Sequence, residues 1–401
     1  MNYDEALAWL YSTQGKGIKL GLENIRELLG ILGISSGKQR FLHVAGTNGK
    51  GSVCAMLDAI CREAGFRTGL FTSPHLLTYR ERIQLDGKLI PEEDVARLLT
   101  ELRDKVAGME THPTFFEIST ALALLWYQEK GAEIVVLETG LGGRLDSTNV
   151  VTPAVSVLMP ISFDHKQWLG DSLAQIAAEK AGIIKPGVPV VSAPQPQEAE
   201  TVFRETAAQL GCALEFVETP VEHEISLAGS HQKVNAAVAV AALKAAGIEV
   251  PEEAIRRGLQ KVVWQGRFQR IGKHTILDGA HNPAAATRLV ETWREVYGQE
   301  KPTILLGILK DKEVAEIVEA LAPLAAEFVL TPVKSERSAT AEEIAEAVQK
   351  TGIPFTIAKT TEQALPLAWK KGRKVLVTGS LFLIGETLAV LGGGKAETSI
   401  Q

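Results

Sequence analysis

Residues 41–52 read Phe-Leu-His-Val-Ala-Gly-Thr-Asn-Gly-Lys-Gly-Ser. An apolar run that predicts a buried strand leads into Gly46, Gly49 and Gly51, with Lys50 at the start of the helical pattern that follows. Glycines let the backbone curl so that several N–H groups face an anion, and a helix N-terminus adds the positive end of its dipole. The stretch therefore predicts a strand–loop–helix unit that binds phosphate, with Lys50 reaching the terminal phosphates.

This loop departs from the usual G-x-x-x-x-G-K-[ST] pattern of phosphate loops. With Lys50 as the anchor, Val44 stands at the first glycine position, and Gly51 stands where a hydroxyl residue is usual, with Ser52 one place later. The alternative interpretation is a glycine turn that happens to contain a lysine. The strand context, the three glycines, the lysine and the serine together favour the phosphate loop.

Outward from this loop, short apolar runs alternate with longer amphipathic patterns. The runs typical of strands are Phe41–Ala45, Thr68–Thr72, Ile134–Glu138, Ala154–Met159, Pro189–Ser192, Thr275–Asp278, Thr303–Gly307, Phe328–Thr331 and Lys374–Thr378. The patterns typical of helices include Ser52–Ala64, Glu92–Val106, Phe115–Gln128, Gln232–Ala245 and Pro283–Val296. This alternation predicts an α/β fold with parallel sheets that helices cover on both faces.

The alternation forms two series, which the stretch Val262–Gly272 separates by breaking the helical pattern. We therefore predict two domains. Residues 1–266 form a P-loop-containing, parallel-sheet ATPase domain, and residues 267–401 form a smaller Rossmann-like α/β domain.

Composition excludes several classes of protein. The 401 residues are 45% apolar and 22% charged, as in soluble globular chains, and 42 basic against 48 acidic residues give a net charge of −6. A nucleic-acid partner is not expected, because the chain has no basic excess. We also expect a cytoplasmic protein without a membrane segment, because no apolar run reaches the roughly 18 residues that span a bilayer and Met1–Leu10 lacks a signal peptide's basic start.

The phosphate loop and the motifs after it resemble the Mur ligase superfamily, specifically the folylpolyglutamate synthase/dihydrofolate synthase family. The resemblance covers nearly the whole chain. Its further motifs are Ser73-Pro74-His75-Leu76, Glu81-Arg82-Ile83, residues 138–149, Asp164-His165, Leu169-Gly170, residues 179–185, His231-Gln232 with Asn235, Gly266-Arg267-Phe268, residues 278–283, Gly307 with Asp311-Lys312, and residues 378–381.

The resemblance implies an ATP-dependent ligase of folate biosynthesis and one-carbon metabolism. In such a reaction ATP phosphorylates a folate-type carboxylate, and the amine of L-glutamate attacks the acyl phosphate to give an amide, ADP and phosphate. Phosphoryl transfer depends on positioning and charge neutralisation, to which metal ions contribute. Ser73–Leu76 and Leu141–Asp146 are closer to the bifunctional pattern, so we expect activity on dihydropteroate and on tetrahydrofolate polyglutamates.

The resemblance also implies roles for individual residues. It makes Lys50, Lys180 and His165 catalytic residues. For binding ATP it implies Thr47, Asn48, Gly49, Lys50, Gly51, Ser52, Asn235, Arg267 and Asp278. It implies two Mg²⁺ sites, with Ser73, Glu138 and His165 as ligands. For the folate it implies Ser73, Pro74, His75, Arg82 and Asp146, and for glutamate it implies His281 and Ser380.

Several of these residues have simpler interpretations that remain open. Lys180 reads by charge alone as a surface lysine, whereas the family carries a carbamylated lysine at the matching position. Glu138 is a hard oxygen ligand that suits Mg²⁺ at the end of a strand, but it can also cap a helix. Residues 278–283 can likewise serve only as a helix cap, most plausibly through Asn282.

Three alternative functions share parts of this pattern. A cell-wall Mur ligase carries a sugar-nucleotide domain before the loop, and only 45 residues precede Gly46 here. A folylpolyglutamate synthase without dihydrofolate synthase activity fits the same motifs. A nucleotide-binding regulatory module would not need the separate cluster of residues 278–283 with Ser380. We expect a monomer whose partners are small-molecule substrates.

Overall fold

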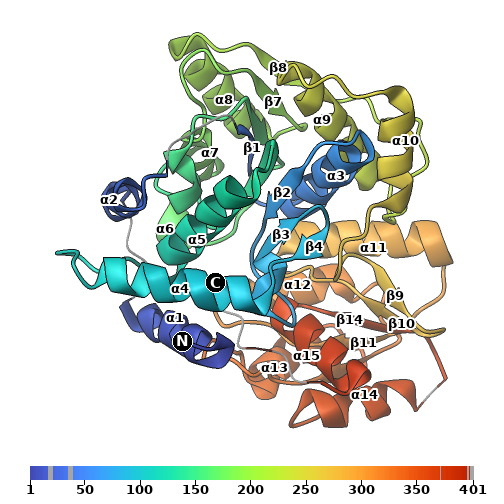
Figure 1. The fold of residues 1–401 in the computed structure, drawn as a ribbon. Helices are drawn as coiled ribbons and strands as arrows, with labels where there is room; N and C mark the ends of the chain where they lie inside the picture. Colours follow the sequence, from blue (N-terminus) through green and yellow to red (C-terminus); the bar gives the residue numbers. More distant parts are fainter. Residues whose placement is uncertain (17–20, 35–38, 371, 395–396, 398–401) are drawn as a thin grey trace.

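The computed structural model describes residues 1–16, 21–34, 39–370, 372–394 and 397. Within these residues the chain forms two α/β units, each built on its own sheet (Figure 1). Among the described residues, no helix combines the length and the apolar character needed to cross a bilayer.

The first sheet has eight strands within the described part of the chain, in the order β4-β3-β2-β5-β1-β6-β7-β8. All neighbours pair in parallel except β2 with β3 and β3 with β4. The strands are β1 (Arg40–Ala45), β2 (Thr68–Phe71), β3 (Ile83–Leu85), β4 (Lys88–Leu89), β5 (Ile134–Glu138), β6 (Val155–Leu158), β7 (Val190–Ser192) and β8 (Leu214–Phe216).

Helices cover both faces of this sheet. They are α1 (Tyr3–Ser12), α2 (Glu23–Ile31), α3 (Lys50–Glu63), α4 (Glu92–Val106), α5 (Phe115–Lys130), α6 (Lys166–Leu169), α7 (Leu173–Ala181), α8 (Gln197–Gln209), α9 (His231–Ala245) and α10 (Glu252–Lys261). Along β5, Val135 and Leu137 join the apolar cluster under α1, α2, α4 and α5, whereas Ile134 and Val136 join the cluster under α3, α9 and α10. Because strand side chains alternate between faces, both sets must be apolar, which explains the continuous apolar run.

The second sheet has six strands in the described residues, in the order β13-β12-β11-β14-β10-β9, and only β9 runs antiparallel to its neighbour. The strands are β9 (Gln269–Ile271), β10 (Thr275–Leu277), β11 (Thr303–Leu306), β12 (Glu327–Leu330), β13 (Phe355–Ile357) and β14 (Val375–Thr378). The helices are α11 (Pro283–Tyr297), α12 (Val314–Leu321), α13 (Ala341–Gln349), α14 (Thr361–Trp369) and α15 (Leu381–Gly392). The first three pack on one face, and α14 and α15 pack on the other.

Each of the nine predicted strands is present to within two residues, and the predicted fold class is confirmed. Five further strands, β3, β4, β8, β9 and β13, escaped prediction. They have two or three residues each and lie at or next to a sheet edge, where a strand does not need a long apolar run. The expectation of parallel sheets was wrong for β3, β4 and β9, which pair antiparallel with their neighbours.

Candidate active site

One pocket collects most of the predicted site residues. It lies where the parallel strands β2, β5, β1 and β6 end at their carboxyl edge, and the second unit closes its other side. The predicted residues that line it are Thr47, Asn48, Gly49, Lys50, Gly51, Ser52, Ser73, Pro74, Glu138, His165, Lys180, Asn235, Arg267, Asp278 and His281. His75, Arg82, Asp146 and Ser380 are not among the lining residues. A ligand in the pocket would therefore touch both units at once.

The predicted phosphate loop joins β1 to α3. Gly49 precedes the helix with a positive φ of 87°, which a glycine adopts without strain. Thr47 and Asn48 donate their N–H groups to the Pro160 carbonyl at 3.0 and 3.3 Å, so the free N–H groups available to an anion are those of the first turn of α3. The Lys50 ammonium donates to the carbonyls of Gly46 and Thr47 at 3.0 and 3.3 Å, which holds it over the loop.

Glu138 and Ser73 lie side by side at the ends of β5 and β2. The Ser73 N–H donates to Glu138 Oε2 at 3.1 Å, and the Glu138 side chain is buried. Burial raises the pKa of Glu138, and the charge of Lys50 is the largest opposing influence. A buried carboxylate beside a serine is a hard oxygen donor set, which fits Mg²⁺ next to a phosphate.

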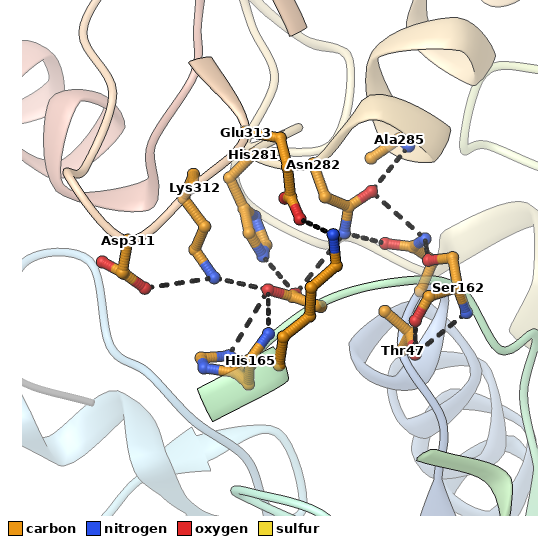
Figure 2. Close-up of polar contacts among 12 residues, drawn as sticks. Thr47, Ser162, His165, His281, Asn282, Ala285, Asp311, Lys312 and Glu313 are labelled. Carbon is orange, nitrogen blue, oxygen red and sulfur yellow. Dashed lines mark hydrogen bonds and ion pairs between the residues drawn. The ribbon is translucent and has the colours of Figure 1, made fainter. Parts of the chain in front are cut away.

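A polar network that includes His165, His281 and Lys312 joins the two units (Figure 2), and Asp164 is the carboxylate that these residues share. Asp164 Oδ1 accepts a 2.6 Å hydrogen bond from Lys312 Nζ, and Asp164 Oδ2 lies 3.6 Å from His281 Nε2. Burial by itself would raise the pKa of Asp164, but the hydrogen bond and charge of His281, together with His165 and Lys312, hold it well below its usual range. Asp164 is therefore an anion at neutral pH, shared between both units.

His165 follows Asp164 with a positive φ of 50° and precedes α6. Burial lowers the pKa of His165 to about 4, so its ring is neutral at neutral pH. A neutral imidazole is the form that binds metals, so the residue fits its predicted role. Within the described residues, no three His, Cys, Asp or Glu side chains cluster as a ready metal site, so the remaining ligands would have to include other groups.

Asn282 links the second unit to the phosphate loop. As the N-cap of α11 its side chain accepts from the Ala285 N–H at 2.8 Å, which confirms the capping interpretation for this residue. Its amide also donates to Asn48 Oδ1 at 3.0 Å (Figure 2). The capping residue of one unit thus contacts the phosphate loop of the other.

Lys180 lies in α7 and is not a surface lysine, because only 4% of it is exposed. Burial, followed by the charge of Lys50, lowers the pKa of Lys180 to about 7. A substantial fraction of its side chains is therefore an uncharged amine at neutral pH.

The predicted folate residues occupy two different places. Ser73 and Pro74 line the pocket, whereas Arg82 and His75 lie buried behind it, with Arg82 Nε donating to His75 Nδ1 at 2.8 Å. The carboxylate of Asp146 accepts N–H groups from Gly140 and Leu141, both at 2.8 Å, and from Thr148. In this structure Asp146 shapes the glycine-rich loop.

Residues of the second unit complete the pocket. Asp278 accepts from the Phe268 and Ala280 N–H groups at 2.9 Å each, and burial raises its pKa against the charge of Arg267. His281 Nδ1 donates to the Gly279 carbonyl at 2.8 Å, which leaves Nε2 toward Asp164. Ser380 is buried and caps α15 by accepting from the Phe382 N–H.

Sequence reasoning missed several residues here. Asp164 and Lys312 belong to motifs of the family resemblance that imply no role for them, and nothing in the sequence signals that Lys312 is buried. The far end of the pocket is lined by His231 of α9, Phe268, and Arg288, Leu289 and Thr292 of α11. His231 and Phe268 belong to motifs that carry the family resemblance, whereas for Arg288 and Thr292 the available signal was their spacing of four residues on one helix face.

Comparisons with known proteins match this architecture. Residues 44–191 match the Mur ligase middle domain, and residues 266–381 match the glutamate ligase domain of Mur ligases. The dihydrofolate synthase/folylpolyglutamate synthase of Bacillus subtilis is 34% identical over 426 aligned residues, covering 96% of this chain and 98% of the relative.

Solved structures agree over the same length. Escherichia coli FolC in complex with DHPP and ADP superposes with a TM-score of 0.88 at 31% identity, covering 97% of this chain and 98% of the other. A bifunctional folylpolyglutamate synthase/dihydrofolate synthase with Mn, AMPPNP and L-glutamate bound gives 0.87 at 30% identity, covering 96% and 98%.

Proposed function

This chain belongs to the folylpolyglutamate synthase/dihydrofolate synthase family of Mur ligases, and on that premise we propose that it joins L-glutamate to both dihydropteroate and reduced folates. It is an ATP-dependent ligase. The observation that carries the proposal is the pocket in which the phosphate loop of the first unit meets His281 of the second.

The reaction needs no covalent bond to the protein. A carboxylate oxygen of the acceptor attacks the γ-phosphorus of ATP, and the bond to the bridging oxygen breaks to release ADP. The glutamate amine then attacks the acyl carbon, phosphate leaves, and the amine loses a proton. Lys50 and the first turn of α3 would offset phosphate charge, and the second unit would keep water from the acyl phosphate.

Mg²⁺ would supply further charge neutralisation when bound. Ser73 and Glu138 fit one ion as oxygen ligands, and the neutral imidazole of His165 fits a second. Lys180 supports the second site if its amine adds CO₂ to form a carbamate, with release of a proton. Its lowered pKa favours that addition, because only the uncharged amine reacts.

We assign the remaining substrates by their place around the pocket. Asn235, Arg267 and Asp278 would hold the nucleotide, and His281 would contact glutamate. Ser73 and Pro74 would contact the folate directly, and Asp146 would act through the loop of Gly140. Direct contacts from His75, Arg82 and Ser380 remain predictions.

Phosphate release tests the proposal. Release should require ATP, a divalent ion, glutamate and an acceptor, with either dihydropteroate or tetrahydrofolate sufficing. Turnover with tetrahydrofolate alone would leave only the polyglutamylase activity. ATP hydrolysis that ignores both acceptors and glutamate would instead identify a regulatory nucleotide-binding module.

The assignment of glutamate to the second unit has its own test. His281→Ala should raise the KM for glutamate while the KM for ATP stays within about twofold of wild type, since His281 lines the pocket from the second unit. An unchanged glutamate KM would contradict the placement.

We further propose a cytoplasmic monomer, with residues 1–266 and 267–401 as its two domains and without a nucleic-acid partner. The net charge of −6 and the small-molecule pocket support the absence of a nucleic-acid partner. Light scattering after gel filtration should give the mass of one chain, and a dimer mass would contradict the monomer.

A further inference from the structure

Gly51, the residue after the phosphate-loop lysine, has no room for a side chain. A Cβ atom placed on it would lie 2.7, 2.8 and 2.9 Å from Nε1, Cζ2 and Cε2 of Trp264, well inside the 3.4–4 Å of an ordinary contact. The indole of Trp264 therefore rests directly on the backbone of the first turn of α3. This contact explains why Gly51 stands where phosphate loops usually carry a hydroxyl residue.

Trp264 is held in place by the helix that precedes it. A Cβ on Gly258 of α10 would lie 2.7 Å from Cα of Ile60, so α10 and α3 pack backbone to backbone. Lys261 Nζ and Arg257 Nε also pair with Glu63, the last residue of α3, at 2.7 and 3.2 Å. Helix α10 is thus fastened to the C-terminal part of α3, and Trp264, which follows α10, meets the first turn of α3.

We propose that Trp264 is a positioning residue for the phosphate loop. Its indole fixes the backbone of Gly51, and thereby fixes the first-turn N–H groups and the stem of Lys50 before nucleotide arrives. The inference rests on the proposed role of this loop in binding ATP. Trp264 itself needs no contact with the nucleotide.

The first test compares single variants. Trp264→Ala should raise the KM for ATP and the Kd for MgADP about tenfold, because a misplacement of positioned groups by about 1 Å costs large factors. The KM for glutamate should change less than about twofold. Trp264→Phe should restore most of the ATP affinity, since its ring still covers Gly51. Val263→Ala is the matched control, because Val263 is 76% exposed and should change nothing.

The second test is a double-mutant cycle with Gly51→Ser, which restores the usual order of glycine, lysine and serine. In the wild-type background the serine should weaken MgADP binding about tenfold. In the Trp264→Ala background it should weaken binding less than about twofold, since the clash is gone. Melting temperatures of all four proteins separate misfolding from weakened binding.

The outcomes are distinguishable. Additive effects in the cycle, or MgADP affinity of Trp264→Ala equal to wild type, would overturn the positioning role alone. If the wild-type protein binds neither MgADP nor MgATP, the result contradicts both the positioning role and the proposed function. If Gly51→Ser does not fold, the comparison of Trp264→Ala with Trp264→Phe still decides the proposal.

Discussion

At the scale of single residues, Lys50 carries the sharpest prediction. Lys50→Ala should lower kcat by about 10²–10³, because it removes a charged donor from the phosphate loop. The fold should persist, since the hydrogen bonds of Lys50 Nζ go to the carbonyls of Gly46 and Thr47 in its own loop. A coupled ADP assay and a thermal melt measure both. Retention of half the wild-type kcat would contradict the loop assignment.

Lys180 predicts a pH dependence of stability. Its pKa is about 7 when folded and near 10.5 when unfolded, so between these pH values the unfolded chain binds more protons. The free energy of unfolding should therefore rise with pH across this window, by up to about 1.4 kcal/mol per pH unit. Lys180→Met should lack this contribution.

Urea denaturation of both proteins measures the effect. It should be done without metal, nucleotide or bicarbonate, at several pH values from about 7 to 10. The difference between wild type and Lys180→Met should grow with pH in favour of wild type. Parallel profiles would mean that Lys180 titrates as an ordinary lysine.

The roles of residues whose neighbours are close in the chain were predicted better than the roles of residues that only the fold brings together. Lys50 and Glu138 stand out because each ends or follows a buried strand. Asp164 and Lys312 do not, because their pairing depends on how the two units meet. The hydroxyl of Ser380 accepts the Phe382 N–H as a helix cap, and its contact with glutamate stays a prediction.

At the scale of elements, the glycine-rich loop after β5 depends on its contact with α7. A Cβ on Gly143 would lie 2.8 and 2.9 Å from the carbonyl oxygens of Lys180 and Glu179. Gly143→Ala should therefore destabilise the protein by about 1–3 kcal/mol and lower kcat, because the loop must move away from Lys180.

Denaturant unfolding and turnover assays measure both effects. Gly30→Ala is the matched control, since Gly30 lies in α2 and a Cβ there meets nothing within 4 Å. It should stabilise by about 0.5–1 kcal/mol through helix propensity. Equal stability of the two variants would show that the loop tolerates the side chain.

The buried elements were predictable and the edge strands were not. A strand covered on both faces, such as β5, must be apolar at nearly every position, so it can be recognised in the sequence as a continuous apolar run. β9 and β13 expose part of their side chains at sheet edges, so their sequences resemble loops.

At the scale of the whole molecule, the contacts between the two units in the described residues include one buried and one exposed lysine–carboxylate ion pair. Lys312 and Asp164 are both under a tenth exposed, whereas the Lys166 side chain, paired with Glu313 at 2.8 Å, is 41% exposed. Lys312→Ala would leave the buried charge of Asp164 without its lysine partner, which should destabilise the protein by about 3–5 kcal/mol. Lys166→Ala should destabilise it by at most about 1 kcal/mol.

Small-angle scattering of the ligand-free protein checks this difference. Lys312→Ala should enlarge the radius of gyration, because opening the units returns Asp164 to water. Lys166→Ala should match wild type. Identical scattering for all three proteins would mean that the Asp164 network does not hold the units together. This geometry was beyond the sequence, which indicated two series of elements but not their mutual orientation.

The strand order of the first sheet has a consequence for synthesis of the chain. β1 lies in the middle of the sheet, where Arg40 pairs with Ile134 and Ala45 pairs with Leu158. The phosphate-loop strand therefore leaves the ribosome long before either neighbour exists. At about 5–20 residues per second, on the order of ten seconds pass before β6 is made. During that interval the apolar strand β1 has unpaired edges. Nascent chains that contain β1 but not yet β5 and β6 are therefore exposed to aggregation.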